Sequence, residues 1–146
     1  MIPSPLGPLT LTASGGAITA LDWRAGACDS TPELLEGEAQ IGAYFDGTRQ
    51  CFDLPLRVEA SAFQRRICDR MHMIPFGETV TYGDIARDLG VPPQAVGTAC
   101  GGNPLPILIP CHRVLGAASL GGFSAQGGVE TKVWLLRHEG AAGLLI

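Results

Sequence analysis

Cys111 is the residue whose type and surroundings most suggest chemistry. It follows a nearly continuous apolar run, residues 105–110, and is followed by His112 and Arg113. A cysteine attacks as its thiolate, so a reactive thiol needs a base or a positive charge nearby. His112 is adjacent in the chain, and Glu139 supplies a carboxylate that could orient the imidazole. One interpretation of this pattern is a thiol nucleophile assisted by a histidine and a glutamate.

A structural cysteine is the other interpretation, with Cys111 buried beside a surface His-Arg pair, and on residue types alone it is the commoner case. Pro104, Pro106 and Pro110 exclude a helix and predict an extended, buried segment that ends at Cys111. Successive side chains of an extended segment point to opposite sides. Direct contact between the Cys111 thiol and His112 is therefore not expected, and a bridging water or a turned backbone would have to connect them.

The bulk composition is that of a compact protein of one or two small domains. The chain has 146 residues, of which 46% are apolar and 16% charged, and its net charge is −4. That charge argues mildly against non-specific binding of a polyanion, although an acidic protein can carry a local basic face. No apolar run is long enough for a transmembrane helix, and the N-terminus lacks the regions of a signal peptide. We expect no membrane partner.

Five cysteines and three histidines are spread through the chain without the spacing of a metal site or a disulfide framework. No Cys-x-x-Cys is present, the cysteines are odd in number, and the histidines stand far apart. We therefore expect a reduced, cytoplasmic protein with no metal and no cofactor, in which a thiol stays available for chemistry. The cysteines are Cys28, Cys51, Cys68, Cys100 and Cys111.

The N-terminal part predicts a small α/β domain over residues 1–57. Two alternating stretches joined at a Ser-Gly-Gly turn predict a β-hairpin. Residues 30–47 predict a helix that Ser30 or Thr31 can cap. Residues 50–56 predict a third strand of the same small sheet.

Residues 58–146 predict a second, mostly helical domain. Ser61 can begin a helix in which Phe63, Ile67 and Met71 recur every four residues, which gives one buried stripe. The closing helix, residues 129–140, is expected to turn three apolar side chains inward: Val133, Trp134 and Leu136.

Two short helical stretches between these helices match a helix-turn-helix. The first, residues 81–90, has Thr81 as its cap and Asp84 at the position of a capping box, and the second covers residues 92–102. Such pairs serve packing more often than DNA binding. The second stretch carries mainly small side chains, so its nearly flat surface would allow close approach to a groove or to a neighbouring helix.

The segment Gly-Asn-Pro-Leu-Pro-Ile-Leu-Ile-Pro-Cys-His-Arg-Val, residues 102–114, closely resembles the active-site segment of the O6-alkylguanine-DNA alkyltransferases, the methylated-DNA–protein-cysteine methyltransferases. The hairpin, the first helix, the paired short helices, a glycine-rich loop over residues 115–128 and the last helix resemble the family in the same order. Nearly the whole chain is therefore covered. The resemblance implies a single-turnover DNA repair protein that flips an alkylated guanine out of the duplex and moves the alkyl group from O6 to a cysteine.

The resemblance also implies roles for five residues. Cys111 would accept the alkyl group, and His112 would act as a water-mediated base that Glu139 orients. Asn103 would brace the active-site turn. Tyr82 would crowd the target phosphate, help to rotate the nucleotide and protonate the departing guanine, although a packing role is the alternative for this residue.

The substrate pocket implied by the resemblance uses the main chain at Cys111 and Val114 to read the exocyclic amine, and the Ser124 N–H to reach O6. Pro106 and Phe123 would line it. The second short helix would approach DNA from the minor-groove side. Its expected DNA-facing residues are Gln94, Ala95, Gly97 and Thr98.

Four positions depart from the family's pattern. Gln94 stands where the family usually has an arginine that enters the base stack, and Gly101 replaces a second basic residue of the same helix. Both changes remove positive charge and predict weaker DNA binding. Phe123 stands where some relatives have tyrosine, and Cys68 where an aromatic residue is common; Cys68 and the nearby Cys100 are interpreted as packing residues.

Three functions stay open on the sequence. The first is repair of double-stranded DNA carrying O6-alkylguanine by a monomer. The second is a sensor that binds such lesions without repairing them, against which Cys111 itself argues, because sensor-type relatives lack that cysteine. The third is a helix-turn-helix regulator that recognises an undamaged sequence on the same fold.

Overall fold

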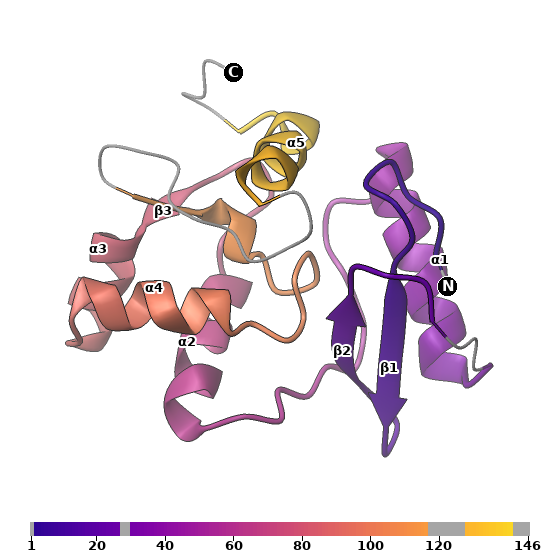
Figure 1. Ribbon diagram of the computed structural model, residues 1–146, viewed down its shortest axis with the longest axis horizontal. Helices are drawn as coiled ribbons and strands as arrows, with labels where there is room; N and C mark the ends of the chain where they lie inside the picture. Colours follow the sequence, from indigo (N-terminus) through magenta and orange to yellow (C-terminus); the bar gives the residue numbers. More distant parts are fainter. Residues whose placement is uncertain (1, 27–29, 117–127, 142–146) are drawn as a thin grey trace. The chain divides into compact units, whose positions relative to one another are not determined.

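The computed structural model describes residues 2–26, 30–116 and 128–141. By their internal contacts the residues form two compact units, Met1–Glu59 and Ala60–Ile146. Figure 1 shows the first unit as a hairpin with one helix and the second as a group of short helices.

The first unit begins with the expected hairpin. Strands β1 (Thr10–Ser14) and β2 (Ala17–Asp22) pair antiparallel. The turn between them consists of Gly15 and Gly16, whose φ angles of +58° and +81° are those of the left-handed region that glycine adopts without strain. The hairpin prediction is confirmed.

Helix α1 (Pro32–Asp46) packs against this hairpin. Thr31 is its N-cap residue but makes no side-chain capping bond. The approach is close, because a Cβ added at Gly37 would lie 2.7 Å from Leu11 Cδ1 and 2.9 Å from Ile18 Cδ1. A glycine at this position therefore lets the helix backbone settle onto the sheet.

The prediction of a third strand over residues 50–56 is wrong. Only one parallel bridge forms there, between Ile18 and Leu56, with Ile18 N–H donating to Pro55 O at 2.7 Å. Pro55 has no N–H to give to a ladder. The buried Gln40 side chain, in turn, bonds both the N–H and the C=O of Asp53, at 2.8 and 3.0 Å. The backbone groups of this segment thus have side-chain partners in place of a neighbouring strand.

The second unit begins with α2 (Ala62–His72). As expected, Ser61 caps it by accepting a hydrogen bond from Gln64 N at 3.1 Å. Ile67 and Met71 are fully buried, whereas Phe63 is half-buried. The four-residue spacing therefore identifies the inner face of the helix.

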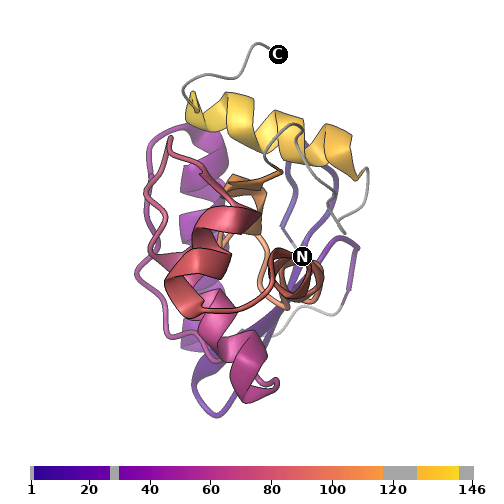
Figure 2. The ribbon, with the colours of Figure 1, turned by 90° about the vertical axis from the view of Figure 1, so that its left-hand side faces the viewer.

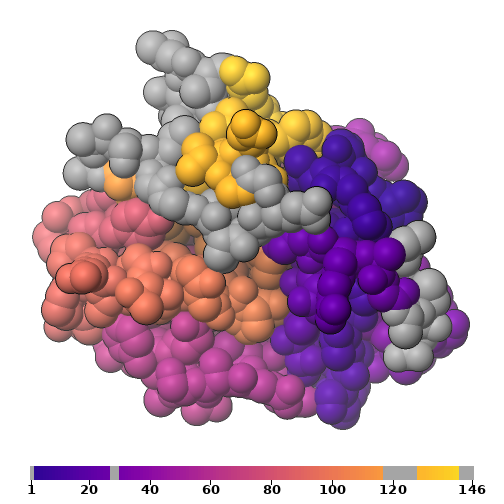
Figure 3. Space-filling view, in the orientation of Figure 1, coloured from indigo at the N-terminus to yellow at the C-terminus, as the bar shows by residue number. Residues whose placement is uncertain are grey.

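Helices α3 (Tyr82–Leu89) and α4 (Pro93–Gly101) form the helix-turn-helix. Thr81 and Asp84 make the predicted capping box at the start of α3, and Gly90 ends that helix with a φ of +66°. In Figure 2 the two helices face the viewer, and α5 (Val129–Glu139) crosses one side of the unit. Figure 3 shows α4, in orange, at the molecular surface.

A short parallel pairing connects the helix-turn-helix to the cysteine segment. Strand β3 (Val80–Thr81) runs directly into α3, and β4 (Val114–Leu115) directly follows the 3-10 turn η1 (Cys111–Arg113). Val80 pairs with Val114 and Thr81 with Leu115. The pairing therefore brings the first residue of α3, Tyr82, toward the turn that contains Cys111.

The inward face of α5 differs from the prediction. Leu136 is buried as expected, but Val133 and Trp134 are only half-buried, and the Trp134 ring stacks on His138. Charged residues occupy part of the inward face, because α5 packs on η1, which offers polar partners. The buried residues are Thr131, Lys132, Leu135, Leu136 and Glu139.

No helix in the described parts of the chain is long and apolar enough to cross a membrane.

The capping box at α3 gives a stability prediction. Thr81→Ala removes the oxygen that accepts from Asp84 N at 3.0 Å, so we expect the free energy of unfolding to fall by about 1 kcal/mol. Thr31→Ala is the matched control, because the Thr31 side chain makes no capping bond, and it should change stability by less than about 0.5 kcal/mol. Urea unfolding measures both, and equal losses in the two variants would contradict the role of the Thr81 oxygen.

Candidate active site

Cys111 lies in a tight turn at the end of a segment that is buried as predicted but turned throughout, so the prediction of an extended backbone is wrong. Residues 103–110 fold into successive turns, Ile107 has a φ of +71°, and Cys111–Arg113 form the 3-10 turn. Backbone bonds close the turns, with Leu108 N–H donating to Pro106 O and Cys111 N–H to Ile109 O, both at 2.8 Å. Prolines exclude a long helix, but they leave these shorter hydrogen bonds possible. Because the backbone turns here, the Cys111 and His112 side chains do not follow the alternation of an extended segment that we expected to separate them.

Asn103 holds the start and the end of this looped segment together. Its Nδ2 donates to Ile109 O at 2.8 Å, and its Oδ1 accepts from Leu105 N at 3.0 Å. The amide is thereby fixed in orientation. It also hydrogen-bonds the Cys111 thiol, and this bond lowers the pKa of that thiol against the effect of burial.

Glu139 is the centre of the polar cluster behind Cys111. One of its oxygens lies 2.7 Å from His112 Nε2, and the Arg113 guanidinium donates to both of them, at 2.8 Å from Nε and 3.0 Å from Nη2. The three residues are buried. Arg113 also donates from Nη1 to Ile74 O at 2.6 Å, which ties the cluster to the chain that follows α2.

These contacts fix the charge states of the cluster. Burial would raise the pKa of Glu139, but the bonds from His112 and Arg113 outweigh it and hold that pKa well below its usual value. Burial lowers the pKa of His112 despite the opposing effect of Glu139. His112 is thus neutral, with its Nε2 proton toward Glu139. Its Nδ1 is buried and has no hydrogen-bond partner within the described ranges, so its lone pair is available to take a proton.

Cys111 is buried, with 5% of its surface exposed, and burial raises the pKa of its thiol to about 11. Asn103 and the positive charge of Lys132 oppose this rise. The thiol therefore needs help to ionise near neutral pH.

Lys132 is a functional candidate that the sequence analysis missed. Its side chain is completely buried, and its Nζ donates to Val114 O at 2.7 Å. Burial lowers its pKa to about 8, against the opposing influence of Cys111 and Cys100. The sequence could have indicated this residue, because Lys132 stands seven residues before Glu139 in a helix, and this spacing puts both side chains on one face.

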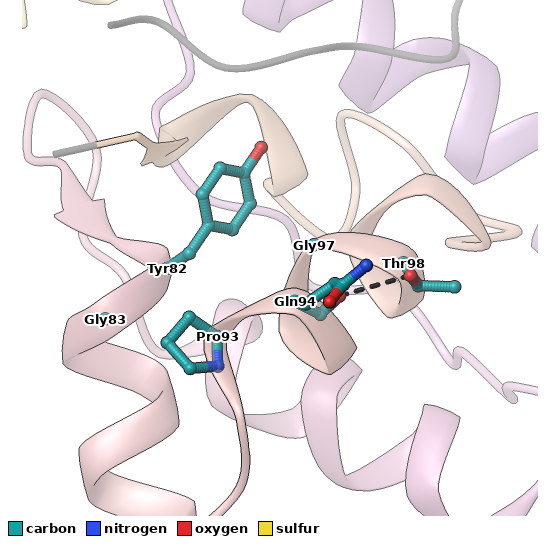
Figure 4. A pocket seen from close by; sticks show the side chains of 6 residues that line it. All are labelled: Tyr82, Gly83, Pro93, Gln94, Gly97 and Thr98. Carbon is teal, nitrogen blue, oxygen red and sulfur yellow. Dashed lines mark hydrogen bonds between the residues drawn. The ribbon is translucent and has the colours of Figure 1, made fainter. Parts of the chain in front are cut away.

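A groove opens between the starts of α3 and α4. Figure 4 shows Tyr82 at its rim, with Pro93, Gln94 and Thr98 along the other side. Gln94 and Thr98 are exposed, and a Cβ added at Gly97 would meet nothing within 4 Å. The α4 surface is therefore flat, as expected. The groove is lined by Tyr82, Gly83, Pro93, Gln94, Gly97 and Thr98.

The other residues considered in the sequence analysis lie on α4, beside the cysteine turn or outside the described residues. Ala95 is half-buried and does not line the groove, and Gly101 is exposed at the end of α4. Pro106 and Val114 are buried beside the cysteine turn. Phe123 and Ser124 lie outside the described residues.

The two other buried thiols have packing contacts. Cys68 Sγ lies 3.9 Å from Asn103 Oδ1, and Cys100 Sγ lies 3.5 Å from Met71 Sδ. Burial raises the pKa of both thiols, and that of Cys100 reaches about 12. Both therefore stay protonated and fit their interpretation as packing residues.

The net negative charge of the chain comes from its first part. Residues 1–59 contain three arginines against eight acidic residues, whereas residues 60–146 contain seven basic and six acidic residues. The net charge of the helix-turn-helix unit therefore does not oppose an approach to DNA.

A buried thiol supported by an imidazole and a carboxylate, next to a helix-turn-helix with a flat second helix, defines a DNA-binding protein with a cysteine nucleophile. Two family models match the chain: the DNA binding domain of 6-O-methylguanine DNA methyltransferase over residues 62–141 and its ribonuclease-like domain over residues 1–58. The chain belongs to the 6-O-methylguanine DNA methyltransferase family.

Similar proteins match along most of their length. A methylated-DNA–protein-cysteine methyltransferase of Metallosphaera sedula is 40% identical over 94% of this chain and 90% of its own. A DNA base-flipping protein of Thermus thermophilus is 42% identical over 96% of this chain and 98% of its own. The crystal structure of the Mycobacterium tuberculosis OGT in complex with DNA superposes with a TM-score of 0.83, at 39% identity, over 95% of this chain and 90% of that one.

Replacing Glu139 should destabilise the protein. Glu139→Gln leaves the Arg113 guanidinium buried without its countercharge, so we expect a loss of about 3–5 kcal/mol in the free energy of unfolding. Because folding lowers the pKa of Glu139, its contribution is complete above about pH 4 and is lost as the pH falls further. Glu130→Gln, an exposed change in the first turn of the same helix, should cost less than about 1 kcal/mol. Denaturant unfolding at neutral and at acidic pH measures both, and an equal loss in the two variants would contradict this account.

Proposed function

We propose that this protein repairs O6-alkylguanine in double-stranded DNA by moving the alkyl group to Cys111, once per molecule. The observation that carries the proposal is the buried Cys111 turn with His112 and Glu139 behind it, next to the groove between α3 and α4. Membership of the family supports it. We further propose that the protein acts as a monomer and that residues 58–146 form the domain that performs the reaction.

The chemistry follows from the protonation states. His112 Nδ1 takes the Cys111 proton through a bridging water, and Glu139 stabilises the imidazolium that forms. The thiolate sulfur then attacks the alkyl carbon, so that an S–C bond forms as the C–O6 bond breaks. Guanine leaves with the bonding electron pair and takes up one proton, for which Tyr82 is the proposed donor. The product is a thioether, and no thiolate is regenerated.

The burial of Cys111 requires that the base leave the duplex. A thiol that is only 5% exposed cannot reach O6 of a stacked guanine, so the nucleotide rotates outward at a cost of a few kcal/mol. We propose that Tyr82, which lies at the rim of the groove, crowds the target phosphate. We propose that Pro106, Val114, Phe123 and Ser124 hold the extruded base and that Asn103 keeps the cysteine turn in shape.

The flat surface of α4 supports the proposed DNA contact. Gln94, Gly97 and Thr98 line the groove, and the glycine leaves room for a close backbone approach. Ala95 follows in the same helix. We propose that these four residues face the minor groove and that Gln94 occupies the place vacated by the flipped base.

A lesion sensor is the second candidate, and one observation favours it: a relative of 42% identity is described as a DNA base-flipping protein. Such a protein would extrude the base and bind it without forming a thioether. The two functions differ in a single measurable product, an alkylated Cys111.

The first test detects alkylated Cys111. Incubation with O6-benzylguanine should add one benzyl group per chain, on Cys111, and Cys111→Ser should abolish the adduct. Cys51→Ser removes an exposed thiol outside the proposed site and should leave the adduct unchanged. Peptide mass spectrometry locates the group. A folded protein that binds lesion DNA tightly but stays unmodified would favour the sensor, and selective binding of an undamaged sequence would favour a regulator.

The second test concerns Gln94. Gln94→Arg adds a positive charge at the groove, so transfer from a duplex oligonucleotide should become about 2- to 5-fold faster, since one exposed charge contact contributes up to about 1 kcal/mol. Transfer from free O6-benzylguanine should stay the same, because that substrate needs no flipping. Gln50→Arg adds the same charge at an exposed site outside the helix-turn-helix unit and is the matched control. Equal acceleration with both substrates would refute a role of this residue in DNA engagement.

A further inference from the structure

A second groove adjoins the groove between the starts of α3 and α4. The two grooves share Gly83 and Pro93, and the second one reaches Gly90 and Pro92 in the turn that joins the helices. Figure 4 shows Gly83 on α3 and Pro93 at the start of α4, where the two grooves meet. The surface proposed to contact DNA therefore extends along α3 as well as along α4.

Arg87 is the charged residue of this surface. Among the described residues that line the two grooves, it alone carries a charge, and 74% of its side chain is exposed. Its Nη1 lies 3.6 Å from the position that a Cβ would take at Gly83, so the guanidinium lies beside a residue that both grooves share. Gly83 directly follows Tyr82, which is proposed to crowd the target phosphate. The positive charge is thus held close to the proposed path of the DNA backbone.

Asp84 holds the guanidinium in this position. Arg87 Nη2 donates to one oxygen of Asp84, and the other oxygen accepts from Thr81 N at 2.9 Å. Because this carboxylate belongs to the capping box, its own place is fixed by the start of α3. A guanidinium has five N–H donors in a planar fork, so Arg87 can bind a phosphate oxygen while it keeps its bond to Asp84.

The other basic residues of the second unit are placed differently. Arg113 and Lys132 are buried, and Arg70 makes two hydrogen bonds to Asp88, at 3.0 and 2.9 Å. Arg87 is therefore the cation of this unit that the proposed DNA surface includes. The remaining ones are exposed and line neither groove: Arg65, Arg66 and Arg137.

We propose that Arg87 binds a backbone phosphate of the target DNA and thereby supplies a positive charge to the surface on which Gln94 and Gly101 supply none. The inference rests on the proposed function, in which duplex DNA is the substrate. A DNA backbone fits this surface because a polyanion is attracted by an exposed cation, and the small residues around it allow a close approach. A phosphate contact fixes the duplex without reading its sequence, which suits a protein that must act on a lesion in any sequence.

Removal of this charge should change the salt dependence of DNA binding. Arg87→Gln loses one phosphate contact, so the plot of log K against log salt concentration should become less steep by about 0.9. The affinity advantage of the wild-type chain over this variant should therefore shrink by about 3.5-fold between about 50 and 200 mM salt. Arg87→Lys keeps a positive charge that can reach a phosphate and should restore most of the slope.

Arg137→Gln is the matched control. It removes the same charge from the same unit, and Arg137, like Arg87, is an exposed residue in the last turn of its helix. Because Arg137 lines neither groove, the salt dependence should stay that of the wild-type chain. An equal change in both variants would mean that only the net charge of the unit matters, and it would refute a specific contact of Arg87.

The experiment has a binding arm and a transfer arm. Binding of the full chain to a labelled duplex with one O6-methylguanine is followed by fluorescence anisotropy across a series of salt concentrations, with Cys111→Ser in every variant so that no transfer occurs. Transfer is measured with Cys111 restored, from a duplex that carries O6-benzylguanine and from free O6-benzyl-2′-deoxyguanosine. Arg87→Gln should slow transfer from the duplex by about 2- to 5-fold and leave transfer from the nucleoside unchanged.

The outcomes separate this inference from the proposed function. No transfer to Cys111 of the wild-type chain from either substrate would contradict the proposed function. Normal transfer together with an unchanged salt dependence in Arg87→Gln would refute only the role of Arg87. Equally slow transfer from the nucleoside and from the duplex in that variant would show that the substitution acts through the fold, and this result would also overturn the phosphate contact.

Discussion

The Glu139 carboxylate, which accepts hydrogen bonds from both His112 and Arg113, is the interaction on which the second unit depends. It joins the last residue of α5 to the turn that contains Cys111, and Arg113 extends the connection to Ile74 O beyond α2. A buried carboxylate is costly unless several donors satisfy it, and here both of its oxygens are bonded. Elements from three parts of the sequence are thus fixed around one anion, and the nucleophile sits at their junction.

The same cluster combines one buried ion pair with one neutral imidazole. Arg113 with Glu139 is a structural pair, because neither group faces the groove and each neutralises the other. His112 is held by that pair, and its Nδ1 has no hydrogen-bond partner among the described residues. This arrangement explains how an uncharged imidazole can sit beside a carboxylate: the arginine satisfies the anion first, so the histidine is not forced to become a cation.

Features that depend on short-range interactions could be predicted from the sequence, whereas features that depend on long-range polar contacts could not. The Gly15-Gly16 turn and the Thr81 capping box depend on a few adjacent residues, and they form as predicted. The strand expected over residues 50–56 fails because Gln40, more than ten residues earlier, takes the backbone groups of Asp53. No periodicity within the segment itself carries that information.

The segment that ends at Cys111 could likewise be predicted only in part from the sequence. The type and order of residues indicated Cys111, His112 and Glu139, and the structure brings His112 and Glu139 into contact at 2.7 Å. The prolines were interpreted as enforcing an extended chain, but Asn103 closes turns between them through Ile109 and Leu105. Lys132 was overlooked because a helical lysine is normally placed on the solvent side.

The burial of Cys111 also shows why stability and reactivity are opposed in this unit. Burial raises the pKa of the Cys111 thiol to about 11, so the resting protein favours the neutral thiol over the thiolate that attacks. A thiol at 5% exposure cannot rely on water to stabilise a negative charge. The groups that favour the thiolate therefore come from the fold itself, because the hydrogen bond from Asn103 and the positive charge of Lys132 both lower the pKa of that thiol.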